Sequence, residues 1–267
     1  DTAAARVRRL AAGVGGSFPA NIQASVTTVL SVISDLGDLR KTAQASQDAL
    51  AVIANYAAPI GDMITLNDLI AQGISDPSLV NDVRTLNSLS LAKDEAAQQR
   101  ALFFHTFTDQ FFGDGEQQAL TTAQSEELSE TASFETTATP AEQKSFITVV
   151  AGRGVDLAEG IEDLILIDGN PLDITQVDGI SLNKAPARWY SAMSDKIDKM
   201  QTVELQVARN IVARSQVLRR GAEESALFNG ILTAVILFLV LIATLAVARS
   251  LVRPLRRLRE GALDHRL

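Results

Sequence analysis

The chain has 267 residues, 46% of them hydrophobic, and a formal net charge of −8, so it can bury one elongated core or two compact ones. It has no cysteine and only two widely separated histidines, His105 and His265, which excludes disulfides and thiolate chemistry and argues against a multi-histidine metal site. The residues after Glu224 include six arginines and two acids, a net charge of +4 that leaves −12 for the rest, so we expect no nucleic acid partner.

Helical patterns dominate the first half of the chain, and no alternating strand pattern of useful length occurs. The residues before Leu10 resemble the middle of a helix, so we expect the sequence to be a fragment whose natural N-terminus lies upstream. Further helices are predicted from Pro19 to about Ile33, from Asp48 to Gln72 with a kink at Pro59, and from an Asp76–Pro77 start to about Phe112, before a glycine break at 113–115.

The second half continues the helical pattern. Helices are predicted from Glu116 to about Thr137, from a Thr139–Glu142 capping box to near Gly152, from Val155 to Ile167, and from near Pro186 onward, with a loop at 168–171. The last helix has apolar residues at helical spacing and no later proline before residue 226, so we expect it to continue into the segment that follows. The predicted fold class is all-α, an antiparallel helical bundle or two bundles that share long helices.

Residues 226–248 form an uncharged apolar segment. As a helix it would measure about 34 Å, enough to cross the hydrocarbon core of a bilayer, whereas soluble core helices are seldom apolar on every face over this length. Arginines cluster directly after it, so the positive-inside rule places residues 249–267 in the cytoplasm and residues 1–225 outside. We therefore predict an extracytoplasmic domain (1–225), a transmembrane helix in the cytoplasmic membrane (226–248) and a cytoplasmic linker (249–267).

The linker has a proline, Pro254, among leucines at heptad spacing. Leu251, Leu255, Leu258 and Ala262 form a short coiled-coil seam directly after the membrane segment. This pattern resembles the opening of a HAMP linker, the parallel coiled coil that follows a transmembrane helix in many bacterial receptors. The alternative is an ordinary basic anchor beside an anionic membrane surface.

No catalytic motif is found. The glycines at 13–16 follow no predicted strand, the polar residues at 168–173 lack the closing glutamate of a calcium loop, and His265 lacks the acidic neighbour typical of a phosphoacceptor histidine. We therefore expect no enzyme activity in this segment, no metal and no cofactor.

The helix that starts at Pro77 has an unusual buried face. Its stripe is apolar at both ends, while Lys93 and Arg100 lie on the same face in the middle, with small alanines between them. Buried cations need a partner, and two alternatives remain open: acidic residues from another helix, or a small oxyanion held by an arginine fork. Near the start of the last helix, Trp189 and Tyr190 are interpreted either as core residues or as a lid over a ligand.

Several segments resemble actinobacterial receptors with a nitrate- and nitrite-sensing domain: Asp38–Arg40, Tyr56, Ala92–Ala101, Arg188–Tyr190 and Arg249–Leu255. The resemblance covers nearly the whole chain and implies an all-helical domain outside the membrane. It also implies an anion site with an arginine from a segment matched here by Lys93, Asp94, Gln98, Arg100 and Ala101, with aspartate replacing glutamate. A second family arginine, in a Gln-x-Glu-Arg segment, is not found, and we expect it to lie upstream of Asp1.

The resulting hypothesis is the sensory part of a two-component histidine kinase that binds nitrate, nitrite or another small anion through Arg100, Lys93 and Gln98. We expect the receptor to be a homodimer that contacts the lipid bilayer and reaches a response regulator only through a kinase part outside this sequence. Two alternatives remain: the sensor of a methyl-accepting chemoreceptor, or a ligand-free structural or protein-interaction module at the cell envelope.

Overall fold

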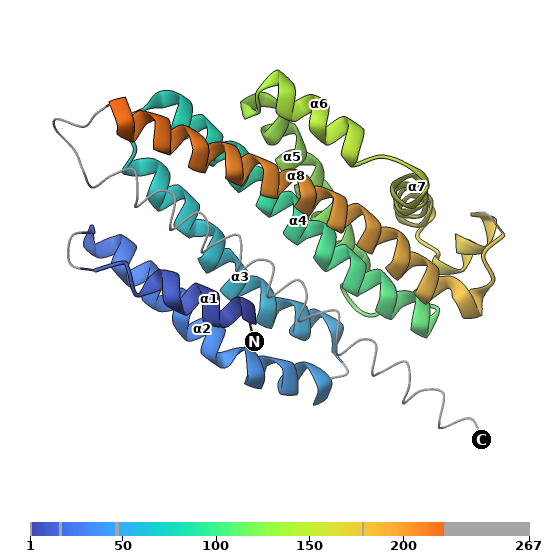
Figure 1. Cartoon of the computed structure of the whole chain (residues 1–267). Coiled ribbons are helices and arrows are strands. Elements are labelled where there is room, and N and C mark those ends of the chain that lie inside the picture. The colour runs from blue at the N-terminus through green and yellow to red at the C-terminus, as the bar shows by residue number, and fades with distance from the viewer. Residues whose placement is uncertain (1, 16–17, 46–47, 178, 222–267) are drawn as a thin grey trace. The chain divides into compact units, whose positions relative to one another are not determined.

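The computed structural model describes residues 2–15, 18–45, 48–177 and 179–221. This part of the chain is helical and contains no strand, which confirms the predicted all-α class. The elements are α1 (Thr2–Ala11), α2 (Ala20–Ala45), α3 (Ala49–Gln72), α4 (Pro77–Asp109), α5 (Glu116–Thr137), α6 (Pro140–Val149), α7 (Arg153–Asp168), two short 3₁₀ helices, η1 (Pro171–Gln176) and η2 (Leu182–Lys184), and α8 (Ala185–Gly221) (Figure 1).

Side-chain caps fix several of the predicted helix starts. The Asp48 carboxylate accepts a hydrogen bond from Ala51 N (3.0 Å), and the Asp76 carboxylate accepts one from Leu79 N (2.8 Å). Thr139 and Glu142 form the predicted capping box at the start of α6. Each cap satisfies backbone N–H groups that the first turn of a helix leaves unpaired.

Other predicted boundaries differ from the structure. Helix α2 extends to Ala45, well past Ile33, because Leu36 continues its buried face. Helix α4 ends at Asp109, since Gln110 adopts a left-handed φ of 65° before Phe112 is reached. Helix α3 contains Pro59 within one helix, as predicted, and the kink expected there stays a prediction.

The chain divides into two compact units. Unit 1 comprises Asp1–Val83 and Ala208–Leu267, and unit 2 comprises Arg84–Val207, so α4 and α8 contribute to both. In the described part of unit 1, α1 packs on α2, and α2 lies antiparallel beside α3 (Figure 1). Its core includes Ile22, Val26 and Val29 of α2 and Tyr56, Met63, Leu66 and Ile70 of α3.

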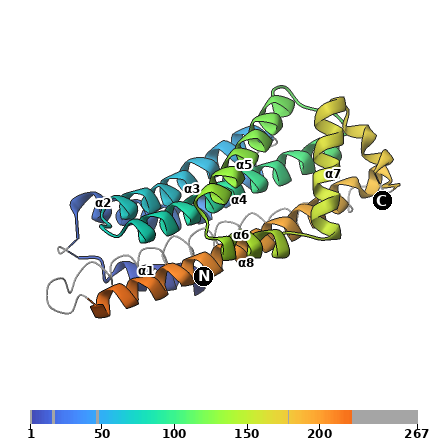
Figure 2. The same ribbon diagram turned by 90° about the horizontal axis from the view of Figure 1, so that it is seen from above.

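Unit 2 is built on α4 and α8, which run antiparallel. In Figure 1, α7 is seen nearly end-on while α4 and α8 are seen from the side, and Figure 2 shows all three from the side. Helix α7 therefore crosses α4 and α8. Helix α8 buries most of the stripe predicted for it, including Met193, Ile197, Met200, Val203 and Val207. Fully buried Phe103, Leu120, Phe134, Ile161 and Trp189 add side chains from α4, α5, α7 and α8 to this core.

The predicted membrane helix (226–248) and HAMP-like linker (249–267) lie outside the described residues. Within those residues, α3 has the length and composition of a membrane-spanning helix, with a mean hydropathy of 1.4. By the same test the apolar core helix of a soluble domain also qualifies, and α3 packs against α2. The structure therefore leaves the predicted topology as an expectation.

Candidate anion-binding site

Two basic side chains of α4 lie in the interior of unit 2. Lys93 and Arg100 are 3% and 4% exposed, on the face of α4 that meets α8. Ala92 and Ala96 on this face are fully buried, and their small side chains let the two helices approach closely. Both cations predicted for the site are therefore withdrawn from solvent and need a partner.

Lys93 finds that partner within the protein. Its Nζ forms a hydrogen-bonded ion pair with Glu204 Oε2 on α8, and Ser90 Oγ donates to the other carboxylate oxygen at 2.6 Å. Glu204 is fully buried. Of the two partners predicted for the buried cations of α4, an acidic residue from another helix is the one that Lys93 has.

Arg100 is in a different situation. Its Nη1 donates to Ser194 Oγ at 3.1 Å, and its guanidinium carbon lies 5.0 Å from the centre of the Tyr190 ring. Within the described part of the chain no carboxylate forms an ion pair with it. Burial lowers the pKa of Arg100 from its ordinary value, while Tyr190 and Asp198 act in the opposite direction. Arg100 is therefore a buried cation held by a hydroxyl and an aromatic face.

Aromatic residues fix the surroundings of Arg100. Trp189 is fully buried, and its Nε1 donates to the Arg100 carbonyl at 3.0 Å. The Trp189 ring packs edge-on against Phe103, with ring centres 4.8 Å apart. Tyr190 packs edge-on against Phe104, and its hydroxyl is buried with no hydrogen-bond partner in the described residues. Trp189 is thus a core residue, whereas Tyr190 brings an unpaired polar atom close to Arg100.

Gln98 lies on the edge of this region. It is half-buried, and its Nε2 donates to Asp94 Oδ2 at 3.2 Å on the same helix. Burial raises the pKa of Asp94 to about 6, against the opposing effects of Gln98 and Lys93. The structure therefore brings Arg100 together with Ser194 and Tyr190 of α8, while Lys93 and Gln98 contact Glu204 and Asp94.

A second group of buried charges was not predicted. Lys196 Nζ of α8 lies 2.8 Å from Glu127 Oε1 of α5 and 3.5 Å from Glu162 Oε2 of α7, and Gln99 Nε2 of α4 donates to Glu127 Oε2 at 2.7 Å. We call these four residues the Lys196 cluster. All four are buried, and burial raises the pKa of Glu162 to about 8, even though Lys196 favours its charged form.

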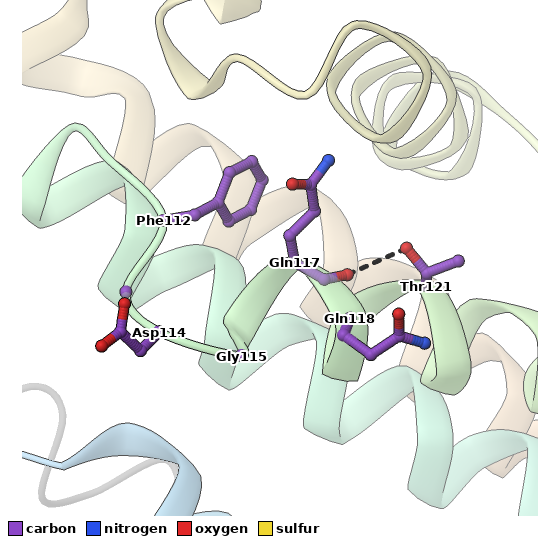
Figure 3. A pocket seen from close by; sticks show the side chains of 7 residues that line it. Phe112, Asp114, Gly115, Gln117, Gln118 and Thr121 are labelled. Atoms are coloured by element: carbon purple, nitrogen blue, oxygen red, sulfur yellow. Dashed lines mark hydrogen bonds between the residues drawn. The ribbon is translucent and has the colours of Figure 1, made fainter.

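The turn between α4 and α5 carries an open polar hollow. Figure 3 shows it lined by Phe112–Gly115, Gln117, Gln118 and Thr121. Glu116 holds the turn, since one of its carboxylate oxygens accepts from Gly113 N at 2.8 Å and the other lies 2.8 Å from His105 Nδ1. The hollow does not include Lys93, Gln98 or Arg100.

The polar residues at 168–173 form a turn. Asn170 caps η1 by accepting from Leu172 N at 3.1 Å, and Asp173 accepts from Gln176 at 2.9 Å. The described residues contain no group of three or more histidine, aspartate or glutamate side chains placed to hold a metal ion.

A family model described as "Nitrate and nitrite sensing" matches residues 1–212. The match includes Arg100 and Lys93 on α4 and Ser194 and Tyr190 on α8. No curated protein and no solved structure matches the chain.

Proposed function

The chain belongs to the nitrate- and nitrite-sensing family, and we propose that it is the sensory module of a signalling receptor that binds nitrate, nitrite or another small planar oxyanion at Arg100. The observation that carries this proposal is the buried Arg100 guanidinium, which contacts a hydroxyl and an aromatic ring rather than a carboxylate. A buried cation that pairs with no carboxylate among the described residues is costly, so an anion that adds negative charge beside it would stabilise this arrangement.

The chemistry around Arg100 suits a planar oxyanion. A guanidinium has five N–H donors in a flat fork, and Ser194 takes only one of the hydrogen bonds that they can make. The Ser194 hydroxyl, which accepts from Arg100, keeps its own proton to donate to an anion oxygen. The unpaired Tyr190 hydroxyl is a further donor. Arg100 therefore supplies the charge, and the two hydroxyls would set the orientation of the ligand.

Lys93 has a supporting role in this proposal. It would reach an anion only by giving up its ion pair with Glu204, which would leave a fully buried carboxylate unpaired. We therefore assign to Lys93 and Glu204 the function of holding α4 and α8 in register. Gln98 lies within one turn of Arg100 on α4 and would contact a ligand only by leaving Asp94.

Helix α8 offers a route for the signal. The Arg100–Ser194 hydrogen bond joins α4 to α8, and α8 continues as one helix to Gly221. An anion bound between Arg100 and Ser194 would change how these helices pack and so shift α8 along or about its axis. We propose that this shift passes through the predicted membrane helix to a HAMP linker and biases a dimeric histidine kinase, with the chemoreceptor rod as the alternative output.

A second function is favoured by the Lys93–Glu204 pair. This internal ion pair is the contact expected of a ligand-free module that only dimerises or holds a partner at the cell envelope. In that case Arg100 would be a structural residue, kept in place by Ser194, Tyr190 and Trp189.

Calorimetric titration distinguishes the two functions. Nitrate and nitrite are titrated into the full chain in detergent, beside Arg100→Ala, Arg100→Lys and, as the control, Arg84→Ala, which removes an exposed arginine from the same helix. The sensor proposal predicts saturable binding to the parent and to Arg84→Ala, loss in Arg100→Ala, and weakened binding in Arg100→Lys, which keeps the charge but loses the fork. Absence of saturable binding in all four proteins would support the ligand-free module, and equal saturable binding by all four would contradict Arg100 as the ligand.

A further inference from the structure

The Lys196 cluster has an imbalance of charge. The single ammonium of Lys196 faces the carboxylates of Glu127 and Glu162, and these three residues are only 3–6% exposed. If both glutamates were ionised, the cluster would keep one uncompensated negative charge in the interior of unit 2. Such a charge is unstable away from water, and a buried carboxyl group usually relieves the cost by taking up a proton.

The neighbouring groups increase this imbalance. Burial raises the pKa of Glu95 on α4 to about 8, and the nearby carboxylates of Asp94, Glu126 and Glu127 add to this effect. On α7, the exposed Glu159 also favours the protonated form of Glu162.

The other cation on this side of α8 does not offset these charges. Lys199 pairs with Asp195 at 2.7 Å and also donates to Ala151 O. The groups that face Glu162 from α5 and its own helix are therefore acidic, and Lys196 is the basic group that faces it from α8.

Two oxygen atoms in the cluster lack donors. Glu162 Oε1 and Gln99 Oε1 are both buried, and neither has a hydrogen-bond partner in the described part of the chain. A buried carboxylate oxygen without a donor is costly, but a proton on that oxygen removes the excess charge and turns an acceptor into a donor. A proton also needs no cavity among these side chains, which come from α4, α5, α7 and α8.

We propose that the Lys196 cluster is a proton-binding site, in which Glu162 holds the proton that balances the two carboxylates against the single ammonium. The ligand is the hydrogen ion itself, which neither the family nor the anion site at Arg100 assigns. Release leaves two carboxylates around one ammonium and weakens the packing of α7 against α5 and α8. The inference is independent of anion binding. Both sites nevertheless share α4 and α8, because Gln99 adjoins Arg100 and Lys196 lies close to Ser194 in sequence.

The sign of the linkage follows from the direction of the pKa changes. Glu162 and Glu95 have pKa values of about 8 in the folded chain, above the ordinary value of 4.5, so the folded state binds more protons than the unfolded state between these limits. Stability is therefore highest at the acidic end of this window, falls as the pH rises towards 8, and levels off above it. Each such proton changes the folding equilibrium constant by roughly tenfold per pH unit within the window.

The test is unfolding of the full chain in nitrate-free buffer at a series of pH values, followed by the fluorescence of Trp189, the single tryptophan. We expect the stability of the parent to fall from pH 6 to pH 8. Glu162→Gln keeps the shape of the side chain but cannot titrate. Its folding equilibrium constant should therefore depend less steeply on pH than that of the parent, by about one proton, which is roughly tenfold per pH unit. Asp163→Asn, which changes an exposed acid beside Glu162, should follow the parent.

The proposal is overturned if Glu162→Gln keeps the full slope of the parent, or if the parent gains stability between pH 6 and pH 8. Infrared spectroscopy provides a second measurement that needs no folded Glu162 variant. A protonated carboxylic acid band should be present at pH 7, absent at pH 10 and retained in Glu95→Gln, and its absence at pH 7 would contradict the proposal. Arg100→Ala should keep the parental pH profile, so failure of the anion site and failure of the proton site are distinguishable.

Discussion

Lys93 on α4 and Glu204 on α8 form an ion pair that is almost completely withdrawn from solvent, and Ser90 completes the hydrogen bonding of the carboxylate. The pair crosses between the two helices that frame the candidate anion site. Because the pair is buried, each charge is stabilised by its partner and not by water, so either charge alone at this position would be unfavourable. Among the described residues, no carboxylate forms an ion pair with Arg100, about two turns further along α4, and this difference distinguishes a structural cation from a candidate ligand.

Removing one partner of the Lys93–Glu204 pair should destabilise the chain strongly. We expect Lys93→Ala to lower the free energy of unfolding by about 3–5 kcal/mol, since Glu204 is left buried and unpaired. Urea unfolding followed by Trp189 fluorescence measures this change, with Lys144→Ala, an exposed lysine of α6, as the control without effect. In a double-mutant cycle, Lys93→Met/Glu204→Leu should lose much less stability than the sum of the losses in Lys93→Met and Glu204→Leu. Strict additivity of these two changes would contradict this view of the pair.

Loss of Lys196 should destabilise unit 2 in a pH-dependent way. In Lys196→Met, Glu162 loses the charge that favours its ionised form, so its pKa rises further. At pH 8 we expect a loss of about 3–5 kcal/mol. The loss should shrink towards pH 5, where Glu162 can remain protonated in the folded chain. Urea unfolding at the two pH values tests this, and an equal loss at both would refute it.

Two glycines of α7 should respond in opposite ways to alanine. A Cβ at Gly154 would lie 2.2 Å from Asp195 Oδ2, whereas a Cβ at Gly160 would meet nothing within 4 Å. Gly160→Ala should therefore stabilise the chain by about 0.5–1 kcal/mol through the helix preference of alanine. Gly154→Ala should give less than this gain or a net loss, because Asp195 must move. The midpoints of thermal unfolding compare the two, and equal stabilisation would show that α7 and α8 are packed less closely here.

The predicted topology can be tested with single cysteines, because the chain has none of its own. Ser129→Cys introduces a thiol at an exposed position of α5, and Ala262→Cys introduces one in the predicted linker. If residues 1–225 are extracytoplasmic, a membrane-impermeant thiol reagent should label intact cells carrying Ser129→Cys and leave Ala262→Cys unlabelled until the cells are opened. The reverse pattern would invert the proposed orientation.

The sequence predicts the helices well because their signals are local. The caps at Asp76 and Thr139, the helix start near Asp48 and the glycine break after α4 depend on a few neighbouring residues, and the structure confirms each of them. The extension of α2 beyond Ile33 was missed, since it depends on packing of a buried face against other helices.

The candidate site was only partly predictable. The stripe on α4 identified Lys93 and Arg100 as buried cations, but their partners come from α8, and pairing between distant helices is not encoded in local spacing. A signal for Glu204 did exist, because it continues the spacing of Ile197 and Met200 and so places an acid on a buried face. Glu127 and Glu162 interrupt the apolar faces of α5 and α7 in the same way.

The most direct test of the central claim is an NMR titration of the arginine side-chain N–H signals of the full chain with nitrate, in which the Arg100 signals are assigned by their loss in Arg100→Lys. We predict that these signals shift saturably with nitrate and that those of the exposed Arg84 do not. Signals of Arg100 that stay unchanged up to saturating nitrate, whether or not calorimetry detects binding elsewhere, would contradict the assignment of Arg100 as the anion ligand.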